Sequence, residues 1–201
     1  MPFATDPTQS LKIFGLAGSL RQGSFNRALL RAAVEVAPKG VEIRIFEGLG
    51  EIPPFNADVE AEGDPEPVVT MKSAIREADA LLIATPEYNY GIPGVLKNAI
   101  DWASRPPDGS VLQGKPAAIM GATPGMTGTA RAQLSLRQAF LFTETYAVLQ
   151  PEVLVARAHE KIDGQGRLND KATRNFIREL LESLIAWTLQ LRQGAARREA
   201  A

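Results

Sequence analysis

The stretch that most constrains the fold is residues 11–37, LKIFGLAGSLRQGSFNRALLRAAVEVA, where an apolar run stops at small residues and resumes with helical spacing. Residues 11–16 predict a short buried strand, and the small residues that follow allow the backbone to turn and to approach another group closely. From Leu29 onward, apolar residues recur every three or four positions, which indicates an amphipathic helix. The stretch therefore predicts a strand, a loop and a helix in succession.

The loop between this strand and this helix has the chemistry of an anion site. A helix that starts just beyond the carboxyl end of a strand directs unpaired N–H groups and a positive dipole end at the crevice there. Ser19, Ser24 and Asn26 can donate hydrogen bonds to phosphate oxygens, and Arg21 can add a charge-assisted one. Ser24 can also be the N-cap of the helix. The alternative is a glycine-rich turn that caps a helix and holds no ligand.

The loop differs from two common nucleotide-binding loops. Residues 18–24 have the outline of a Walker loop, but Ser24 follows Gly23 without the lysine that reaches the outer phosphates of a triphosphate. The G-x-G-x-x-G run of dinucleotide-binding folds is also missing from the sequence. A monophosphate therefore fits this loop better than a triphosphate or a dinucleotide does.

The rest of the sequence alternates strand and helix patterns. Four further strands are expected at residues 41–46, 80–85, 116–122 and 152–155, and the main further helices at residues 68–78, 95–104, 129–146 and 171–191. Five strands that alternate with helices predict a parallel sheet covered on both faces. Ligands of such sheets bind beyond the carboxyl ends of the strands, where the loops after the first, third and fourth strands are expected to meet. The proline-rich, acidic segment 47–67 is either a functional loop or a mobile connection.

Composition limits the class of protein. A chain of 201 residues is long enough for one domain with a substantial core, expected over residues 11–192 between tails at 1–10 and 193–201. A net charge of −1 argues against nucleic acid or an acidic membrane surface as the main partner. Without cysteine there is no disulfide or thiolate, so redox chemistry needs a bound cofactor.

Other sequence signals are weak. Residues 1–10 lack the regions of a signal peptide and no apolar run reaches the length of a membrane span, so a cytoplasmic location is expected. No spaced set of His, Asp and Glu predicts a metal site. The single histidine, His159, is expected to have no catalytic role.

The second loop, residues 86–91, joins a rigid proline, two tyrosines and a glycine whose backbone can come close to a flat ring. A flavin needs such stacking or edge contacts, together with backbone groups for its polar rim. Tyr88 and Tyr90 could equally be ordinary surface or interface aromatics. Glu87 could be a general base, although solvation or helix capping is favoured for a loop carboxylate.

Two long motifs, GSLRQGSFN at residues 18–26 and TPEYNYGIPGVLKNAIDW at residues 85–102, closely resemble the NADPH-dependent FMN reductase family, which includes chromate and quinone reductases. The resemblance extends over roughly residues 11–187. It implies a flavodoxin-like three-layer sandwich with a five-stranded parallel sheet in the order 2-1-3-4-5. It also implies that FMN takes electrons from NADPH or NADH and passes them to small acceptors such as quinones, with chromate and azo compounds as further candidates.

The resemblance also assigns residues to the cofactor. The phosphate and ribityl end of FMN is expected at Ser19, Arg21, Ser24, Phe25 and Asn26. The flavin ring is expected at Pro86, Glu87, Tyr88, Asn89, Tyr90 and Gly91. The third loop, GATPGMTG at residues 121–128, departs from the family because it lacks the usual initial serine and glycine pair, and Thr123 and Gly125 are assigned to the ring edge. No side chain is assigned as a catalytic acid or base.

The helices after the third and fourth strands carry more apolar residues than one sheet face readily covers, which favours a homodimer or homotetramer. The interface is expected at Ile92, Val95, Leu96 and Trp102 on one helix and at Leu134, Leu136, Phe140 and Phe142 on the other. An alternative function is a flavodoxin-like electron carrier, which the near balance of 22 basic and 23 acidic residues disfavours. A phospho-receiver is disfavoured because small residues, not acidic ones, end the first strand.

Overall fold

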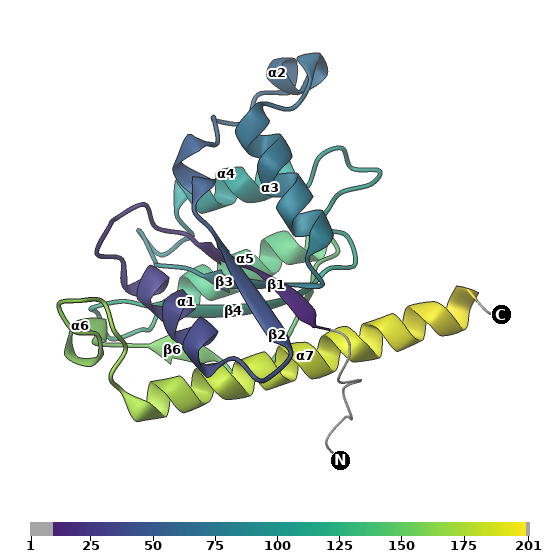
Figure 1. The fold of residues 1–201 in the computed structure, drawn as a ribbon. Coiled ribbons are helices and arrows are strands. Elements are labelled where there is room, and N and C mark those ends of the chain that lie inside the picture. Colours follow the sequence, from purple (N-terminus) through teal and green to yellow (C-terminus); the bar gives the residue numbers. More distant parts are fainter. Residues whose placement is uncertain (1–9, 200–201) are drawn as a thin grey trace.

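A parallel sheet runs through the centre of the molecule (Figure 1). The computed structural model describes residues 10–199. The strands are β1 (Leu11–Ala17), β2 (Val41–Phe46), β3 (Ala80–Ala84), β4 (Pro116–Ala122), β5 (Tyr146–Ala147) and β6 (Val153–Val155). They lie in the order β2-β1-β3-β4-β5, and β6 also pairs with β4. All pairings are parallel, so the predicted flavodoxin-like order is confirmed.

The fifth position of the sheet is shared by two short strands. β5 pairs with the start of β4 through Tyr146 and Ala147, whereas β6 pairs with the end of β4, where Val153 lies opposite Met120. The strand predicted at residues 152–155 corresponds to β6. β5 was missed because it falls at the end of the helix predicted for residues 129–146, and two residues are too few to show a strand period.

Helices cover both faces of the sheet (Figure 1). They are α1 (Phe25–Val36), the short 3-10 helix η1 (Gly48–Glu51), α2 (Ala57–Glu62), α3 (Glu66–Glu77), α4 (Gly94–Ala103), α5 (Ala130–Phe142), α6 (Ala158–Lys161) and α7 (Lys171–Glu199). One hydrophobic cluster joins α1 and α7 to one face of the sheet, and a second cluster joins α3, α4 and α5 to the other face. The result is a three-layer sandwich.

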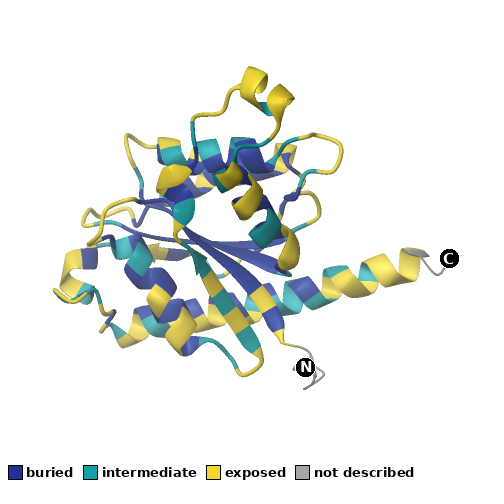
Figure 2. Ribbon diagram, turned by 45° about the horizontal axis from the view of Figure 1, so that its top comes forward, coloured by how far each residue is buried: buried dark blue, intermediate teal, exposed yellow. Residues whose placement is uncertain are grey.

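The central strands are the most buried part of the chain (Figure 2). Every residue of β3 and β4 is buried, as expected for parallel strands that carry helices on both faces. β2 lies at the edge of the sheet, and its residues are half-buried or exposed. Burial of one large aliphatic side chain contributes about 1.5–3 kcal/mol, so these strands carry much of the stability of the fold.

The last helix continues past the residue where the sequence predicts its end. α7 runs from Lys171 to Glu199, so the tail expected from Gln193 onward is helical over nearly all of its length. Residues 195–198 are exposed, and this end of the helix extends beyond the sheet in Figure 1. The tail predicted at the amino terminus lies outside the described residues except for Ser10.

The segment between β2 and α3 is fastened to α4 in its first half. Asn98 donates a hydrogen bond of 2.9 Å to the carbonyl of Pro53, and its side-chain oxygen accepts one of 2.7 Å from the N–H of Phe55. The indole N–H of Trp102 donates to the same Pro53 carbonyl at 2.8 Å. Further along, α2 has no buried residue and projects from the molecule (Figure 2). The segment is therefore attached to α4 near Pro53 and Phe55, and its second part protrudes from the sandwich.

No helix within residues 10–199 combines the length and the apolar character needed to cross a membrane.

Candidate functional site

Three loops meet at the carboxyl edge of the sheet, after β1, β3 and β4. These strands are neighbours, so their ends lie side by side. The N–H of Gly18 donates to the carbonyl of Ala84 at 2.9 Å, and the N–H of Thr85 donates to the carbonyl of Met120 at 2.9 Å. The N–H of Thr123, at the start of the third loop, donates to the carbonyl of Val155 at 3.0 Å. Each of the three loops thus begins with one hydrogen bond that continues the sheet, which fixes where the loop departs.

The first loop presents the amino terminus of α1 to this crevice. Ser24 is the N-cap, and its hydroxyl accepts a hydrogen bond of 3.3 Å from the N–H of Arg27. The N–H groups of Phe25 and Asn26 have no hydrogen-bond partner among the described residues. Two free N–H groups and the positive end of a helix dipole are the elements of an anion site. This geometry fits a phosphate group.

Polar side chains surround that helix end. Ser19 is buried, and its hydroxyl accepts from the N–H of Arg21 at 3.4 Å. The guanidinium of Arg21 lies 5.0 Å from the centre of the Phe25 ring, within the range of a cation–π contact. This contact holds a positive charge next to the start of α1, where it would attract an anion.

Asn26 has a different role from the one that the sequence predicts. Its side-chain amide donates to the carbonyl of Ala122 at 3.0 Å, and its side-chain oxygen accepts from the N–H of Ala122 at 2.9 Å. The residue is 2% exposed. Because this side chain is buried and joined to β4 at both ends, it is not free to face the crevice as the sequence predicts: its amide ties α1 to β4, and its backbone N–H is the group left unpaired at the start of α1.

The second loop is a two-residue turn. Tyr88 and Gly91 exchange two backbone hydrogen bonds of 3.0 Å. Asn89 and Tyr90 between them have φ values of 50° and 68°, a left-handed pair typical of the turns that close hairpins. Tyr88 is 52% exposed and Tyr90 is 72% exposed. The loop therefore carries two aromatic rings at the open side of the crevice.

Glu87 points toward α5. One oxygen of its carboxylate accepts from the backbone N–H groups of Arg131 and Ala132 at 3.0 and 3.3 Å, and the other accepts from the guanidinium of Arg131. The capping alternative considered for Glu87 is thus the one that the structure shows. The sequence analysis does not single out Arg131; the signal that could have found it is its position at the start of the helix after the third loop.

The third loop is fixed by β6 and α6. The N–H of Thr123 donates to the carbonyl of Val155 at 3.0 Å, and the carbonyls of Thr123 and Gly125 accept from the N–H groups of Ala158 and Arg157 at 3.0 Å each. The hydroxyl of Thr123 accepts from the N–H of Gly125 at 3.2 Å. These bonds fix the path of the loop and occupy the backbone N–H and carbonyl groups of Thr123 and Gly125.

Packing between these elements requires a glycine at position 121 and leaves little room for a side chain at Gly18. A Cβ on Gly121 would lie 1.8 Å from the hydroxyl oxygen of Thr129 and 2.5 Å from the carbonyl of Thr85. A Cβ on Gly18 would lie 3.0 Å from a methyl carbon of Leu96 on α4. The close approach inferred for Gly18 is therefore explained by α4.

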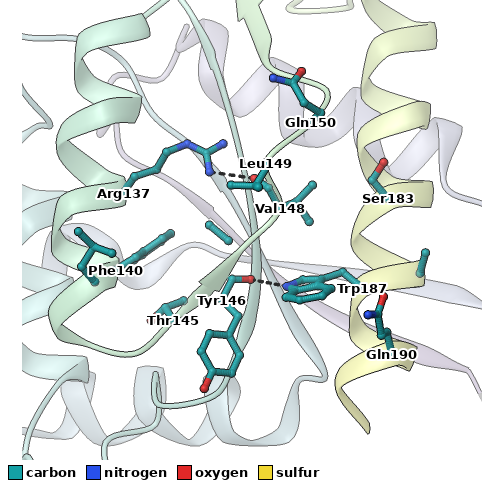
Figure 3. A pocket seen from close by; sticks show the side chains of 13 residues that line it. Arg137, Phe140, Thr145, Tyr146, Val148, Leu149, Gln150, Ser183, Trp187 and Gln190 are labelled. Carbon is teal, nitrogen blue, oxygen red and sulfur yellow. Dashed lines mark hydrogen bonds between the residues drawn. The ribbon is translucent and has the colours of Figure 1, made fainter. Parts of the chain in front are cut away.

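One hollow lies away from this crevice (Figure 3). It has a volume of about 630 Å³ and lies between α5, β5 and α7. Trp187 donates to the carbonyl of Tyr146 at 2.9 Å, and Arg137 donates to the carbonyl of Val148 at 2.9 Å. Because β5 pairs with the amino end of β4, this hollow is at the opposite end of that strand from the three loops.

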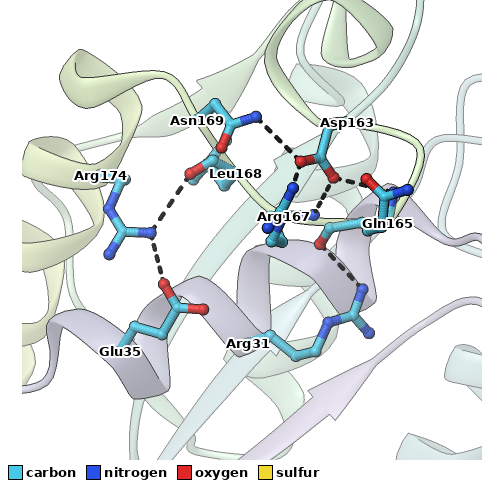
Figure 4. A network of polar contacts seen from close by, with 9 residues as sticks. Arg31, Glu35, Asp163, Gln165, Arg167, Leu168, Asn169 and Arg174 are labelled. Carbon is cyan, nitrogen blue, oxygen red and sulfur yellow. Dashed lines mark hydrogen bonds and ion pairs between the residues drawn. The ribbon is translucent and has the colours of Figure 1, made fainter.

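Asp163 organises the turn between α6 and α7 (Figure 4). Its carboxylate accepts from the N–H groups of Gln165 and Arg167 at 3.0 and 2.9 Å, and from the side chains of Arg167 and Asn169. These donors, chiefly Arg167, lower the pKa of Asp163 from 3.8 to about 2. All of the donors come from the turn itself, so the network is structural.

The single histidine of the sequence, His159, lies on the surface. The side chain of His159 is 55% exposed, 3.8 Å from the carboxylate of Glu160. Within residues 10–199, no group of three His, Asp or Glu side chains is arranged to hold a metal ion.

Comparison with known proteins agrees with this geometry. The family model described as NADPH-dependent FMN reductase matches residues 11–160. An NAD(P)H-dependent FMN reductase from Pseudomonas aeruginosa is 48% identical over 92% of this chain and 99% of its own length. A quinone reductase from Escherichia coli is 41% identical over 85% of this chain and 91% of its own length. Among solved structures, the flavoenzyme NAD(P)H:(acceptor) oxidoreductase FerB from Paracoccus denitrificans superimposes with a TM-score of 0.81 at 34% identity, covering 90% of this chain and 98% of its own.

Proposed function

Because this chain belongs to the NADPH-dependent FMN reductase family, we propose that it is an FMN-dependent enzyme that transfers electrons from NADPH or NADH to small acceptors such as quinones. The observation that carries the proposal is the crevice at the carboxyl edge of the sheet. It has a helix amino terminus on one side and two exposed tyrosines on another. When bound there, FMN supplies the redox chemistry, and the protein supplies binding and orientation.

The phosphate of FMN is assigned to the first loop. The free N–H groups of Phe25 and Asn26, the hydroxyls of Ser19 and Ser24, and the guanidinium of Arg21 all lie at the start of α1. Ser24 uses a lone pair to cap the helix, which leaves its O–H free to donate. Neutral donors with one adjacent arginine suit a monoester phosphate, and no lysine extends the site toward a triphosphate.

The flavin ring is assigned to the second and third loops, with Pro86 to Gly91 on one side and Thr123 and Gly125 on the other. The backbone N–H and carbonyl groups of Thr123 and Gly125 are bonded within the protein, and those of Tyr88 and Gly91 are bonded to each other. The polar rim of the ring is therefore assigned to the other backbone groups of these two loops. Tyr88 and Tyr90 are exposed and give the open face an aromatic border. A flat nicotinamide or quinone is the partner that such a border favours.

The described residues near the crevice do not offer a free acid or base. The carboxylate of Glu87 is 8% exposed and bonded to α5 through both oxygens. His159 lies on α6 with its side chain in solvent. A flavin held between these loops would supply the hydride chemistry, for which the reacting atoms must be aligned at about 3–3.5 Å. The proton that quinone reduction also consumes would come from solvent.

We also propose a homodimer or a dimer of dimers. The interface predicted from the sequence needs correction, because Leu96, Trp102, Leu136 and Phe140 are core residues with at most 2% exposure. Of the other predicted residues, Ile92 and Val95 are half-buried, whereas Leu134 and Phe142 are 58% and 86% exposed. Leu141 and Leu149, which the sequence analysis does not name, are 82% and 76% exposed. These exposed side chains lie on α5 and beside the hollow of Figure 3. This α5 patch is a contact surface of the kind that oligomers bury.

The proposal also includes the partner and the location. The acceptor is a small molecule, neither nucleic acid nor a membrane is a partner, and the protein is cytoplasmic. The formal charge of −1 supports the absence of a nucleic-acid role. The alternative of an electron carrier lacks the one-signed charge that docking onto protein partners favours.

The test is direct. The purified protein is examined for a flavin absorbance spectrum, and NADPH and NADH are then added separately without oxygen. Bleaching of the flavin by either nicotinamide, followed by recovery on addition of a quinone, is expected. A bound flavin that neither nicotinamide bleaches would favour the electron carrier, and a protein that binds no FMN would refute the proposed function.

A further inference from the structure

The amino terminus of α5 is capped by a residue of the second loop and not by the residue that precedes the helix. Thr129 occupies the N-cap position, but its side chain makes no capping hydrogen bond and its φ is 71°. The N–H groups of Arg131 and Ala132 instead donate to the carboxylate of Glu87, 44 and 45 residues earlier in the chain. A carboxylate at the start of a helix also interacts favourably with the helix dipole. One side chain of the second loop therefore completes the helix that follows the third loop.

The same carboxylate holds the side chain of Arg131. The Nε of Arg131 donates to Glu87 at 2.9 Å, and a terminal nitrogen of the guanidinium lies 2.8 Å from the same oxygen. The side chain of Glu87 is 8% exposed and that of Arg131 is 43% exposed. An ion pair with one buried partner is screened less by solvent than a pair on the surface, so the guanidinium has a defined position.

Tyr90 rests on that guanidinium. The central carbon of the Arg131 guanidinium lies 3.9 Å from the centre of the Tyr90 ring, a close cation–π contact. Tyr90 is otherwise 72% exposed, and its φ of 68° is unfavourable for a residue with a side chain. A glycine would adopt this backbone conformation without strain. A glycine at this position would have no ring to place against Arg131. The contact with the guanidinium is thus what a tyrosine adds at this turn.

We propose that Glu87, Arg131 and Tyr90 form a clamp that sets the gap between the second and third loops. Glu87 fixes the base of the second loop to α5, and Arg131 holds the Tyr90 ring at the rim. All three are positioning residues, because their contacts are with one another. The inference rests on the proposed function, since the gap that the clamp sets is the one assigned to the flavin ring and to the flat substrate beside it.

Four variants separate this role from a merely structural one. Glu87→Gln keeps an oxygen for the N–H groups but removes the charge that holds Arg131. Arg131→Lys keeps a charge but loses the planar group that stacks on Tyr90. Tyr90→Gly relieves the unfavourable φ and removes the ring, whereas Tyr90→Phe retains the ring. Arg137→Lys is the matched control, because Arg137 is on the same helix but contacts Val148 near the hollow of Figure 3.

Three measurements are made on each protein: FMN affinity from quenching of flavin fluorescence, KM and kcat with a quinone, and hydrogen exchange of the Arg131 and Ala132 amides in the apoprotein. Glu87→Gln, Arg131→Lys and Tyr90→Gly are expected to weaken FMN binding and raise KM by about three- to tenfold, the range of one cation–π contact. We expect kcat to change less than KM. Tyr90→Phe should keep most of the wild-type FMN affinity and KM, because it retains the ring, and Arg137→Lys should match the wild type in both. Glu87→Gln is also expected to speed exchange at the two amides, because a neutral amide oxygen accepts their hydrogen bonds more weakly than a carboxylate oxygen does.

The outcomes are distinguishable. If the wild type binds FMN and Tyr90→Gly is at least as stable as the wild type with unchanged FMN affinity and KM, the clamp is refuted and Tyr90 is only a strained turn residue. Unchanged exchange at the Arg131 and Ala132 amides in Glu87→Gln would also refute it. If the wild type binds no FMN, the proposed function fails, and the exchange data still decide whether Glu87 fastens the two segments.

Discussion

The side-chain amide of Asn26 and the backbone of Ala122 exchange two hydrogen bonds, of 2.9 and 3.0 Å, across 96 residues of sequence. Ala122 is the last residue of β4, and Asn26 is in the first turn of α1. The pair therefore joins the helix that follows the first strand to the end of the fourth, beneath the crevice where the three loops meet.

Asn26→Ala is expected to destabilise the protein. The substitution leaves the N–H and carbonyl of Ala122 without partners in a buried place, which costs about 1–3 kcal/mol of unfolding free energy. Urea unfolding of the apoprotein measures this loss. Asn26→Asp retains an acceptor for the N–H but places an oxygen against the carbonyl, so it should be at least as unstable. A free energy of unfolding equal to that of the wild type in both variants would contradict the tie.

Ser24 has two separable roles, and two substitutions distinguish them. Ser24→Ala removes the cap, which lowers apoprotein stability by about 1 kcal/mol, and it removes a phosphate donor, which weakens FMN binding by roughly ten- to a hundredfold. Ser24→Asp retains a good cap but places a negative charge next to the phosphate. It should keep apoprotein stability near the wild-type value and lose FMN binding. Tight FMN binding by Ser24→Asp would argue against the phosphate assignment.

The Asp163 network predicts a specific acid dependence. Its donors lower the pKa of Asp163 to about 2 in the folded protein, from 3.8. The contribution of the ionised form is thus present above about pH 4 and is lost as the pH falls toward 2. The difference in thermal stability between wild type and Asp163→Asn should be largest near neutral pH and shrink across that window. A difference that stays constant from pH 6 to pH 2.5 would show that the charge is not what stabilises the turn.

Turnover should follow a ping-pong scheme. The border formed by the second loop leaves one open face, and the sequence has no second dinucleotide fingerprint, so NAD(P)H and the acceptor are expected to exclude one another. Double-reciprocal plots at several quinone concentrations should be parallel, with inhibition by quinone at high concentration. His159→Ala should not alter the rate with NAD(P)H, whereas Tyr88→Glu should slow it. Intersecting plots would indicate separate sites and a ternary complex.

The α5 patch predicts the oligomeric state. Light scattering at micromolar concentration should give a dimer or a tetramer, and Phe142→Asp, which places a charge on an 86% exposed ring position, should shift the protein toward the monomer. Val69→Asp, at an exposed apolar residue on α3 outside the patch, is the control and should not change the mass. A wild-type monomer would rule out this surface as an interface.

Sequence patterns were sufficient for the sheet because buried parallel strands are continuous apolar runs. β4 begins at Pro116 and ends at Ala122 as predicted, and β3 differs from its prediction by one residue. The order of the strands came from the family resemblance and is confirmed. β5 was not predictable, because two residues stabilised by pairing with β4 leave no pattern of their own.

Long-range partnerships limited the prediction of the site. Asn26 was assigned to phosphate because its neighbours in sequence suit phosphate, and its partner Ala122 cannot be inferred from local spacing. Glu87 was expected to be solvated or to cap a helix, but the identity of that helix depends on how the second loop lies over α5. The free N–H groups at the start of α1, by contrast, follow from the local strand–loop–helix pattern and were predictable.

The length of α7 has a consequence for when the protein can fold. The matched family region ends at residue 160, whereas α7 begins at Lys171 and buries Ile177, Leu181 and Leu184 against the face of the sheet that α1 also covers. Each such side chain contributes about 1.5–3 kcal/mol, and a whole domain is stable by only about 5–15 kcal/mol. A nascent chain that already contains every loop of the crevice has this face of its sheet covered by α1 but not by α7. During synthesis, we therefore expect the sheet and the crevice at its edge to become stable only after the last helix has been translated.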